Sequence, residues 1–182
     1  MPLKGPLLAL GLAALASVAT SAPNPGGVLS GVPAGRAVWT EVKWPFLLDQ
    51  WGTGRAFQCR AADCGHELNI YLRPKIGFCN CTTGVSDDAE LDRVGDIDLI
   101  GQQFAPLGDG RPITVGWMNG RSRSYSVEVR RTALALAFND RCDVVVATVV
   151  GDRELTSTAE RVAVAFLNSS LVLRWVEASL GL

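Results

Sequence analysis

Apolar and polar residues alternate most regularly between Glu67 and Phe78. The odd positions up to Lys75 are polar, whereas the even positions, interrupted only by Pro74, carry the apolar set Leu68, Ile70, Leu72, Ile76 and Phe78. A period of two predicts a β-strand with one face in the core and one polar face. The preceding segment alternates in the same way, and residues 62–65 have turn-forming side chains. We therefore expect a hairpin over 56–76.

A second hairpin is expected around Asn119-Gly120. A three-residue loop over 118–120, with Gly120 left-handed, gathers the apolar residues on one face, whereas a two-residue turn centred on Asn119-Gly120 scatters them. The resulting pairs are Trp117 with Arg121, Val115 with Arg123, and Ile113 with Tyr125. This register predicts an arginine guanidinium lying on the Trp117 ring. The candidates for a binding surface are accordingly Trp117, Arg121, Arg123 and Tyr125.

The segments 132–138 and 142–150 predict a third hairpin. The first segment has large residues on one face and small ones on the other, namely Leu134, Leu136 and Phe138 against Ala133, Ala135 and Ala137. The second segment is apolar on both faces from Val144 onwards. Such strands occupy the middle of a sheet that is covered on both sides. The alanine face lets a helix approach closely, and we expect the C-terminal helix to use it.

Helix signals occur in two places. Asp87 begins an acidic segment that extends to Asp98 and suits a short helix, with Asp87 as N-cap. Ser157-Thr158-Ala159-Glu160 has the sequence of a capping box, and apolar residues then recur at helical spacing. Residues 168–170 interrupt this helix, and a second helical segment over 171–180 ends at Gly181.

The element order predicts an α+β fold with a mainly antiparallel sheet of about six strands. A short helix and a C-terminal helical segment pack on that sheet. A further strand over 38–44 is expected to end at Pro45. In element order alone, the chain resembles the PsbP/Mog1 type of three-layer sandwich. The expected organisation is a leader at 1–19, a flexible segment at 20–36 and one globular domain at 37–182.

The N-terminus has the layout of a secretory leader. Lys4 precedes an apolar run from Leu7 to Ala16 and a stretch of small residues, and we expect cleavage after Ala19. The run is too short to cross a bilayer, so we expect no transmembrane segment after cleavage. Removing Lys4 leaves 16 basic against 18 acidic residues, a formal charge of −2. This balance speaks against a nucleic-acid partner. The leader favours a periplasmic or secreted protein.

Export puts the cysteines in an oxidising compartment, where disulfides form. The candidates are Cys59, Cys64, Cys79, Cys81 and Cys142. Cys59 and Cys64 flank a turn and can join locally, and one of Cys79 and Cys81 can join Cys142, which leaves one free thiol. Other pairings, such as Cys64 with Cys79 or Cys81, stay open because spacing does not determine connectivity.

Metal binding is the alternative use of these residues. Cys79 and Cys81, with His66 as the only histidine, offer soft ligands for copper or zinc, although their spacing matches no zinc module. The acidic residues over 87–98 are read as a solvated helix start rather than a calcium loop, because they lack the EF-hand spacing. No catalytic motif is recognisable. We therefore expect a non-catalytic binding or envelope-associated module, without a cofactor, whose partner is a protein or small ligand.

Overall fold

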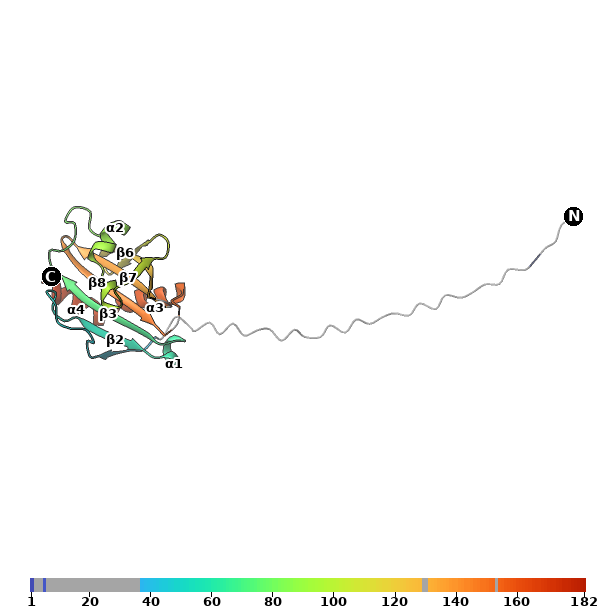
Figure 1. Cartoon of the computed structure of the whole chain (residues 1–182), viewed down its shortest axis with the longest axis horizontal. Coiled ribbons are helices and arrows are strands. Elements are labelled where there is room, and N and C mark those ends of the chain that lie inside the picture. Colours follow the sequence, from blue (N-terminus) through green and yellow to red (C-terminus); the bar gives the residue numbers. More distant parts are fainter. Residues whose placement is uncertain (2–4, 6–36, 129–130, 153) are drawn as a thin grey trace. The chain divides into compact units, whose positions relative to one another are not determined.

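The computed structural model describes residues 1, 5, 37–128, 131–152 and 154–182. The expected leader at 1–19 and flexible segment at 20–36 lie outside these residues, apart from Met1 and Gly5. The remainder of the described chain forms a sheet with helices on both of its faces (Figure 1).

The sheet has eight strands and is antiparallel throughout, in the order β1-β2-β3-β8-β7-β6-β4, with β5 also paired to β6. The strands are β1 (Trp39–Val42), β2 (Arg55–Cys59), β3 (Leu68–Lys75), β4 (Phe104–Pro106), β5 (Arg111–Val115), β6 (Met118–Val127), β7 (Arg131–Asp140) and β8 (Asp143–Gly151). The prediction of an antiparallel α+β fold is confirmed, but about six strands was too few. Three-residue β4 was missed because three exposed residues are too few to show a period of two.

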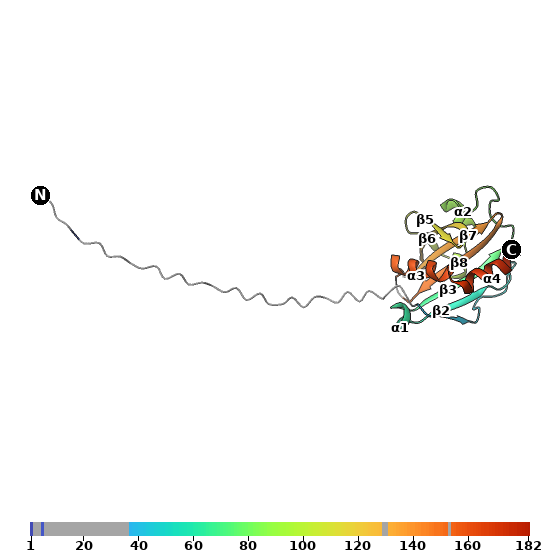
Figure 2. The same ribbon diagram turned by 180° about the vertical axis from the view of Figure 1, so that it is seen from behind.

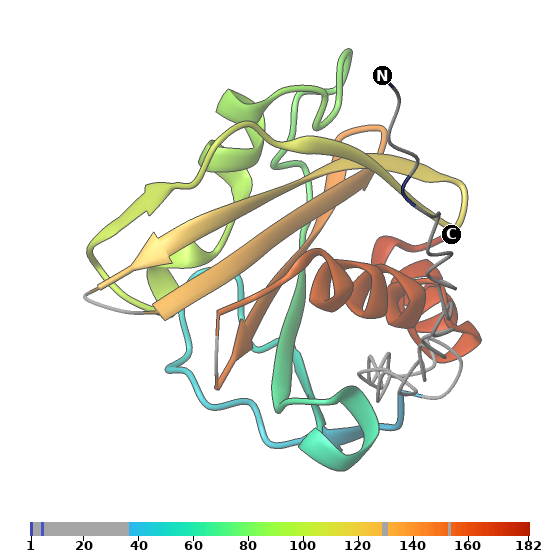
Figure 3. The same ribbon diagram turned by 90° about the vertical axis from the view of Figure 1, so that its right-hand side faces the viewer.

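Four α-helices and one 3-10 helix accompany the described part of the sheet. They are α1 (Ala61–Cys64), α2 (Asp88–Val94), η1 (Ile97–Leu99), α3 (Ser157–Leu167) and α4 (Ser170–Leu180). The C-terminal helices α3 and α4 cover one face, which lies at the front in Figure 2. Seen from the side in Figure 3, α2 lies across the sheet from them. The sheet is therefore the middle of three layers.

The central hairpin β7–β8 is covered on both faces as predicted, but the helices take opposite faces from those expected. The C-terminal helices pack on the face with Leu134, Leu136 and Phe138, where α3 contributes Phe166. The alanine face instead receives α2 and η1, through Leu91, Val94 and Ile97. Short alanines leave room for a helix to lie close to the strands, and the short α2 uses that room.

The register of the β5–β6 hairpin differs from the prediction. Val115 pairs with Met118, so the turn consists of Gly116 and Trp117, and Gly116 has a φ of 58°. Gly120 lies inside β6 opposite Phe138 instead of in the turn. The predicted contact between an arginine and the Trp117 ring is absent from the described residues, and Trp117 is 47% exposed. A glycine in a strand often marks close backbone approach, and here it was misread as a turn signal.

Gly120 is required by the tight packing of β6 against β7. A Cβ at this position would lie 2.0 Å from the Ala137 carbonyl oxygen, a contact that backbone atoms cannot relieve by rotation. We expect Gly120→Ala to lower the free energy of unfolding by about 1–3 kcal/mol, as overpacked sites do. Urea denaturation measures the change, with Ser124→Ala on the same strand as the control. Equal stability of the two variants would show that β6 shifts without penalty.

The helix ends partly follow the prediction. Asp87 caps α2, since its side chain accepts a hydrogen bond from the Glu90 amide, and α4 ends at Gly181 with a left-handed φ of 73°. The predicted capping box is wrong, because Thr156 is the N-cap of α3 and makes no side-chain cap bond. The Glu160 carboxylate is engaged elsewhere, by Arg111 and by the Ser122 hydroxyl, with Ser122 on β6. A tertiary contact has thus replaced a local one.

Within the described residues, no single helix is long and apolar enough to span a membrane. Taken together, α3 and α4 satisfy the length and composition criteria as a pair bent by 62°.

Candidate functional site

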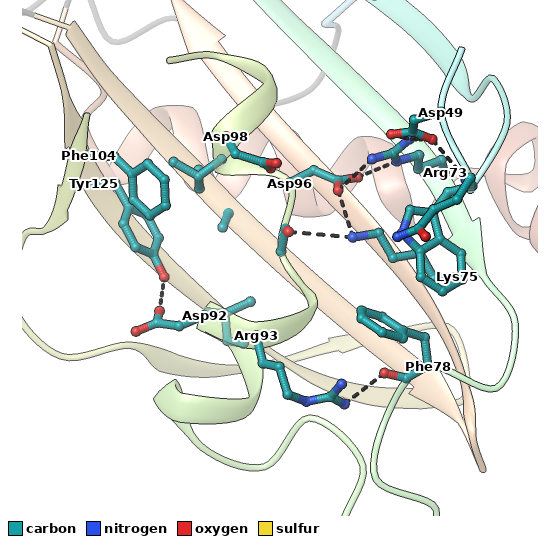
Figure 4. Close-up of a pocket in the computed structure, with 16 residues that line it drawn as sticks. Asp49, Arg73, Lys75, Phe78, Asp92, Arg93, Asp96, Asp98, Phe104 and Tyr125 are labelled. Carbon is teal, nitrogen blue, oxygen red and sulfur yellow. Dashed lines mark hydrogen bonds and ion pairs between the residues drawn. The ribbon is translucent and has the colours of Figure 1, made fainter. Parts of the chain in front are cut away.

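A cavity of about 590 Å³ lies on the alanine face of the sheet, beside α2 and η1. Figure 4 shows Phe104 and Tyr125 on one side of it, and Arg73 and Lys75 on the other, with Asp96 between the two groups. The cavity walls come from β3, the segment after it, α2, η1, β4, β6, β7 and the loop between β1 and β2. Elements that are far apart in the sequence therefore meet here.

The loop between β1 and β2 follows β3 across its polar face. Phe46 packs edge-on against Tyr71 at 4.8 Å between ring centroids, and Trp51 lies 4.5 Å from Phe78. Asp49, between these rings, accepts hydrogen bonds from Arg73 at 2.7 Å. The predicted polar face of β3 is thus covered by a loop at its C-terminal half.

Two cations and one carboxylate are buried under this loop. Arg73, Lys75 and Asp96 are only 3%, 4% and 4% exposed. Arg73 donates to both oxygens of Asp96, at 2.6 and 2.8 Å. The Lys75 ammonium lies 2.7 Å from Asp96 Oδ1 and donates to the Val94 carbonyl, also at 2.7 Å. Buried charges need this kind of pairing, because an unpaired charge in a low dielectric is strongly unfavourable.

The ion pairs shift the pKa values of Arg73 and Asp49. Desolvation lowers the pKa of Arg73, but its hydrogen bonds with Asp96 and Asp49 outweigh that effect and raise the pKa above its ordinary value. The same hydrogen bond with Arg73 lowers the pKa of the Asp49 carboxyl. Arg73 is therefore a permanent cation in this wall.

Aromatic rings close the Lys75 end of the cavity. The Lys75 ammonium lies 5.6 Å from the Trp51 ring centroid and 5.4 Å from that of Phe78. The Arg93 guanidinium lies 4.8 Å from the Phe78 centroid, and it donates to the Phe78 carbonyl at 2.8 Å. Arg93 also pairs with Glu90. The cationic groups of this wall are thus all paired with carboxylates, carbonyls or ring faces.

The opposite wall is formed by Tyr125 and Phe104. Tyr125 is buried, its hydroxyl donates to Asp92, and its ring lies 6.1 Å from that of Phe104 in a T-shaped arrangement. Burial, followed by the hydrogen bond with Asp92, raises the pKa of Tyr125. Phe104 is 45% exposed and presents an apolar surface at the cavity mouth.

The predicted binding-surface residues are only partly brought together. Arg121, Arg123 and Tyr125 share the α2 face of β6, where Arg121 pairs with Asp88 and Arg123 pairs with Asp92 at 2.9 Å. Tyr125 is the one member that lines the cavity. Trp117 lies in the β5–β6 turn, at the end of the strand away from Tyr125.

One charged residue of the cavity wall has no partner among the described residues. The carboxylate of Asp98, in η1, is exposed and takes part in no hydrogen bond or ion pair there. The carboxylates of Asp49, Asp92 and Asp96 are all engaged by arginines. Among the described residues, Asp98 therefore supplies the unpaired charge of the cavity wall.

Two disulfides stabilise the fold. Cys59 and Cys64 join across α1 with their Cα atoms 6.0 Å apart, and Cys81 joins Cys142 in the β7–β8 turn. Cys79 keeps a free thiol and is buried. These bonds fit a protein that folds in an oxidising compartment.

The residues of the metal hypothesis are not brought together as ligands. His66 precedes β3 and Cys79 follows it, and eight residues of strand span about 26 Å. The Cys81 sulfur is bonded to Cys142. No group of three or more His, Cys, Asp or Glu side chains in the described chain is placed to hold a metal ion. The geometry thus gives the copper or zinc alternative no support.

The acidic segment over 87–98 is also not simply a solvated helix start. Asp88 and Asp92 pair with arginines of β6, and Asp96 is buried between Arg73 and Lys75. These carboxylates fasten α2 and η1 to the sheet. This part of the prediction was wrong because the partners come from distant strands.

The described lining of the cavity includes no serine, threonine, cysteine or histidine. Its carboxylates, apart from Asp98, are engaged in ion pairs within the described chain. The arrangement is a cavity with aromatic walls and paired charges. No protein-family model matches this chain, and no curated protein matches its sequence. The cavity geometry is therefore the basis for inferring the function.

Proposed function

We propose that this chain is an exported, non-catalytic binding protein whose ligand occupies the cavity on the alanine face. The observation that carries the proposal is the cavity of about 590 Å³ with aromatic walls and a fully paired buried ion network. Ligand cavities commonly have a volume in this range and combine apolar walls with polar groups that orient the ligand. A network whose described charges are paired with one another holds the walls in place.

The charge pattern favours an organic cation as the ligand. The cations of the wall are paired with carboxylates, whereas Asp98 has no partner among the residues that the structure describes. The rings of Phe104 and Tyr125 present the negative faces to which ammonium groups are attracted. An amine with an apolar or aromatic part would match both features.

Export is supported by two observations of different kinds. Met1 to Ala19 has the composition of a secretory leader, and the described chain has two disulfides. Disulfides of this kind persist outside the reducing cytosol. Both observations support the proposal of a periplasmic or secreted protein.

Three probes with one ring and different charge test the ligand class. Benzylamine, benzyl alcohol and benzoate are titrated into the full chain by isothermal calorimetry or NMR. We expect benzylamine to bind most tightly, because only it can pair with Asp98. Equal binding of benzoate, or no binding of any probe, would contradict the proposed site.

Two variants assign the contacts. Asp98→Asn is expected to weaken the binding of benzylamine by up to about fivefold, which corresponds to about 1 kcal/mol for an exposed pair. The affinity for benzyl alcohol should stay unchanged. Phe104→Ala is expected to lower the affinity for all three probes by about threefold or more. The matched controls are Asp109→Asn, an exposed aspartate outside the cavity, and Leu171→Ala, an exposed residue of α4.

A further inference from the structure

The free thiol of Cys79 lies beside a disulfide rather than alone. The Cys79 amide donates to the Cys142 carbonyl at 3.1 Å. Its Sγ donates to the carbonyl of Arg141, the residue immediately before Cys142, at 3.3 Å. Cys142 is bonded to Cys81, two residues beyond Cys79. Three sulfurs that can form two alternative disulfides are thus gathered at the β7–β8 turn.

The two competing cysteines differ in exposure. Cys79 is 6% exposed, whereas Cys81 lies on the surface. We propose that Cys79 displaces Cys81 from Cys142, so that Cys81 is a concealed modification site that becomes an exposed thiol. The reagents it would accept are small disulfides of the glutathione type.

The exchange balances without any external oxidant. The Cys79 thiol loses its proton, and its thiolate attacks the Cys142 sulfur. The Cys79–Cys142 bond forms as the Cys81–Cys142 bond breaks, and the Cys81 thiolate leaves and takes up a proton. When oxidised glutathione is present, that thiolate attacks it instead, forming a mixed disulfide and releasing one reduced glutathione.

The backbone supports both pairings. The hydrogen bond from Cys79 to the Cys142 carbonyl keeps these two residues adjacent whichever sulfur is bonded. The following residues form their own turn, in which the Asn80 side chain accepts from the amides of Thr82 and Thr83. Release of Cys81 therefore leaves the turn that carries it with its own hydrogen bonds.

The surroundings of Cys79 determine the rate of the thiol–disulfide exchange. Burial, aided by the nearby carboxylates of Glu90 and Asp143 and opposed by Arg93, raises the pKa of the Cys79 thiol to about 11. The thiol is therefore protonated at neutral pH, and exchange is slow there. The rate should increase with pH as the thiolate fraction grows.

Native labelling separates the two thiols. The folded full chain is incubated at about pH 9 with oxidised glutathione or iodoacetamide, and peptide mass spectrometry then locates the label and the disulfides. The proposal requires the label on Cys81 together with a Cys79–Cys142 disulfide. A label on Cys79, or no label until the protein is denatured, would overturn it.

Two variants test the role of Cys79. Cys81→Ser should fold with a Cys79–Cys142 disulfide. A folded product in which Cys79 and Cys142 are both free thiols would exclude the alternative bond. Cys79→Ser should resist native labelling, because the attacking thiol is gone. Labelling of Cys81 in that variant would show direct opening of the disulfide and overturn the exchange. The Cys59–Cys64 bond is the internal control in every sample. None of these readouts depends on the ligand cavity.

Discussion

Replacing Asp96 with asparagine is expected to lower the free energy of unfolding by about 3–5 kcal/mol, the range for breaking a buried ion pair by removing one partner. Asp96 is the only carboxylate that contacts both Arg73 and Lys75 within the described chain. Its loss leaves two buried cations with reduced compensation. Urea denaturation followed by circular dichroism measures the change.

Asp49 provides the matched control, because it pairs with the same arginine from a more exposed position. Its side chain is 38% exposed, against 5% for Asp96. We expect Asp49→Asn to lower stability by less than about 1 kcal/mol. Similar losses of stability in the two variants would mean that the loss does not depend on how deeply the carboxylate is buried.

The pair between Arg73 and Asp49 also has a defined pH dependence. The hydrogen bond from Arg73 lowers the pKa of Asp49 in the folded state below its unfolded value. The contribution to stability is therefore complete above the unfolded pKa and is lost as the pH falls through the lower folded pKa. Stability at neutral pH should not respond to small pH changes through this group.

The buried network illustrates what the alternation along β3 could not reveal. A period of two assigned Arg73 and Lys75 correctly to the face opposite Ile70 and Leu72. It does not say what covers that face. The covering loop contains one sequence signal of this packing, its aromatic residues Trp44, Phe46 and Trp51. A loop that is exposed on all sides seldom needs such residues.

Local signals predicted the elements that depend on neighbours in sequence. The hairpins over 56–76 and 132–150 follow from alternation, and the end of α4 at Gly181 follows from a left-handed glycine. Contacts between distant strands determined the rest. Gly120 has the signature of a turn, yet the close approach of β7 places it inside a strand.

Candidate chemistry was harder to locate than the fold. Asp98 stands out only because the other acidic residues of its segment are engaged. Asp88, Asp92 and Asp96 pair with arginines of β3 and β6. Glu90 pairs with Arg93, and Asp87 caps α2. In the sequence, all of them belong to one acidic stretch. The cavity is thus a property of tertiary packing, whereas the cysteine cluster was visible from spacing and compartment.

Removing Cys142 is the second change with a large expected effect. The Cys81–Cys142 bond spans 61 residues, for which loop-closure entropy gives about 4 kcal/mol, whereas the Cys59–Cys64 bond spans five and gives about 2 kcal/mol. Cys142→Ala removes the sulfur to which either Cys81 or Cys79 would be bonded, so neither disulfide can form. We therefore expect it to lower stability by about 4 kcal/mol in oxidising buffer.

Comparison with Cys81→Ser turns this loss into a test of the alternative bond. If Cys79 replaces Cys81, the closed loop grows by only two residues, and loop-closure entropy is almost unchanged because it varies with the logarithm of length. Cys81→Ser should then be roughly 3 kcal/mol more stable than Cys142→Ala, allowing for some strain. Adding a reductant should remove that difference, since neither variant then has a bond to Cys142. Equal stability of the two variants in oxidising buffer would mean that the free thiol of Cys79 never reaches Cys142.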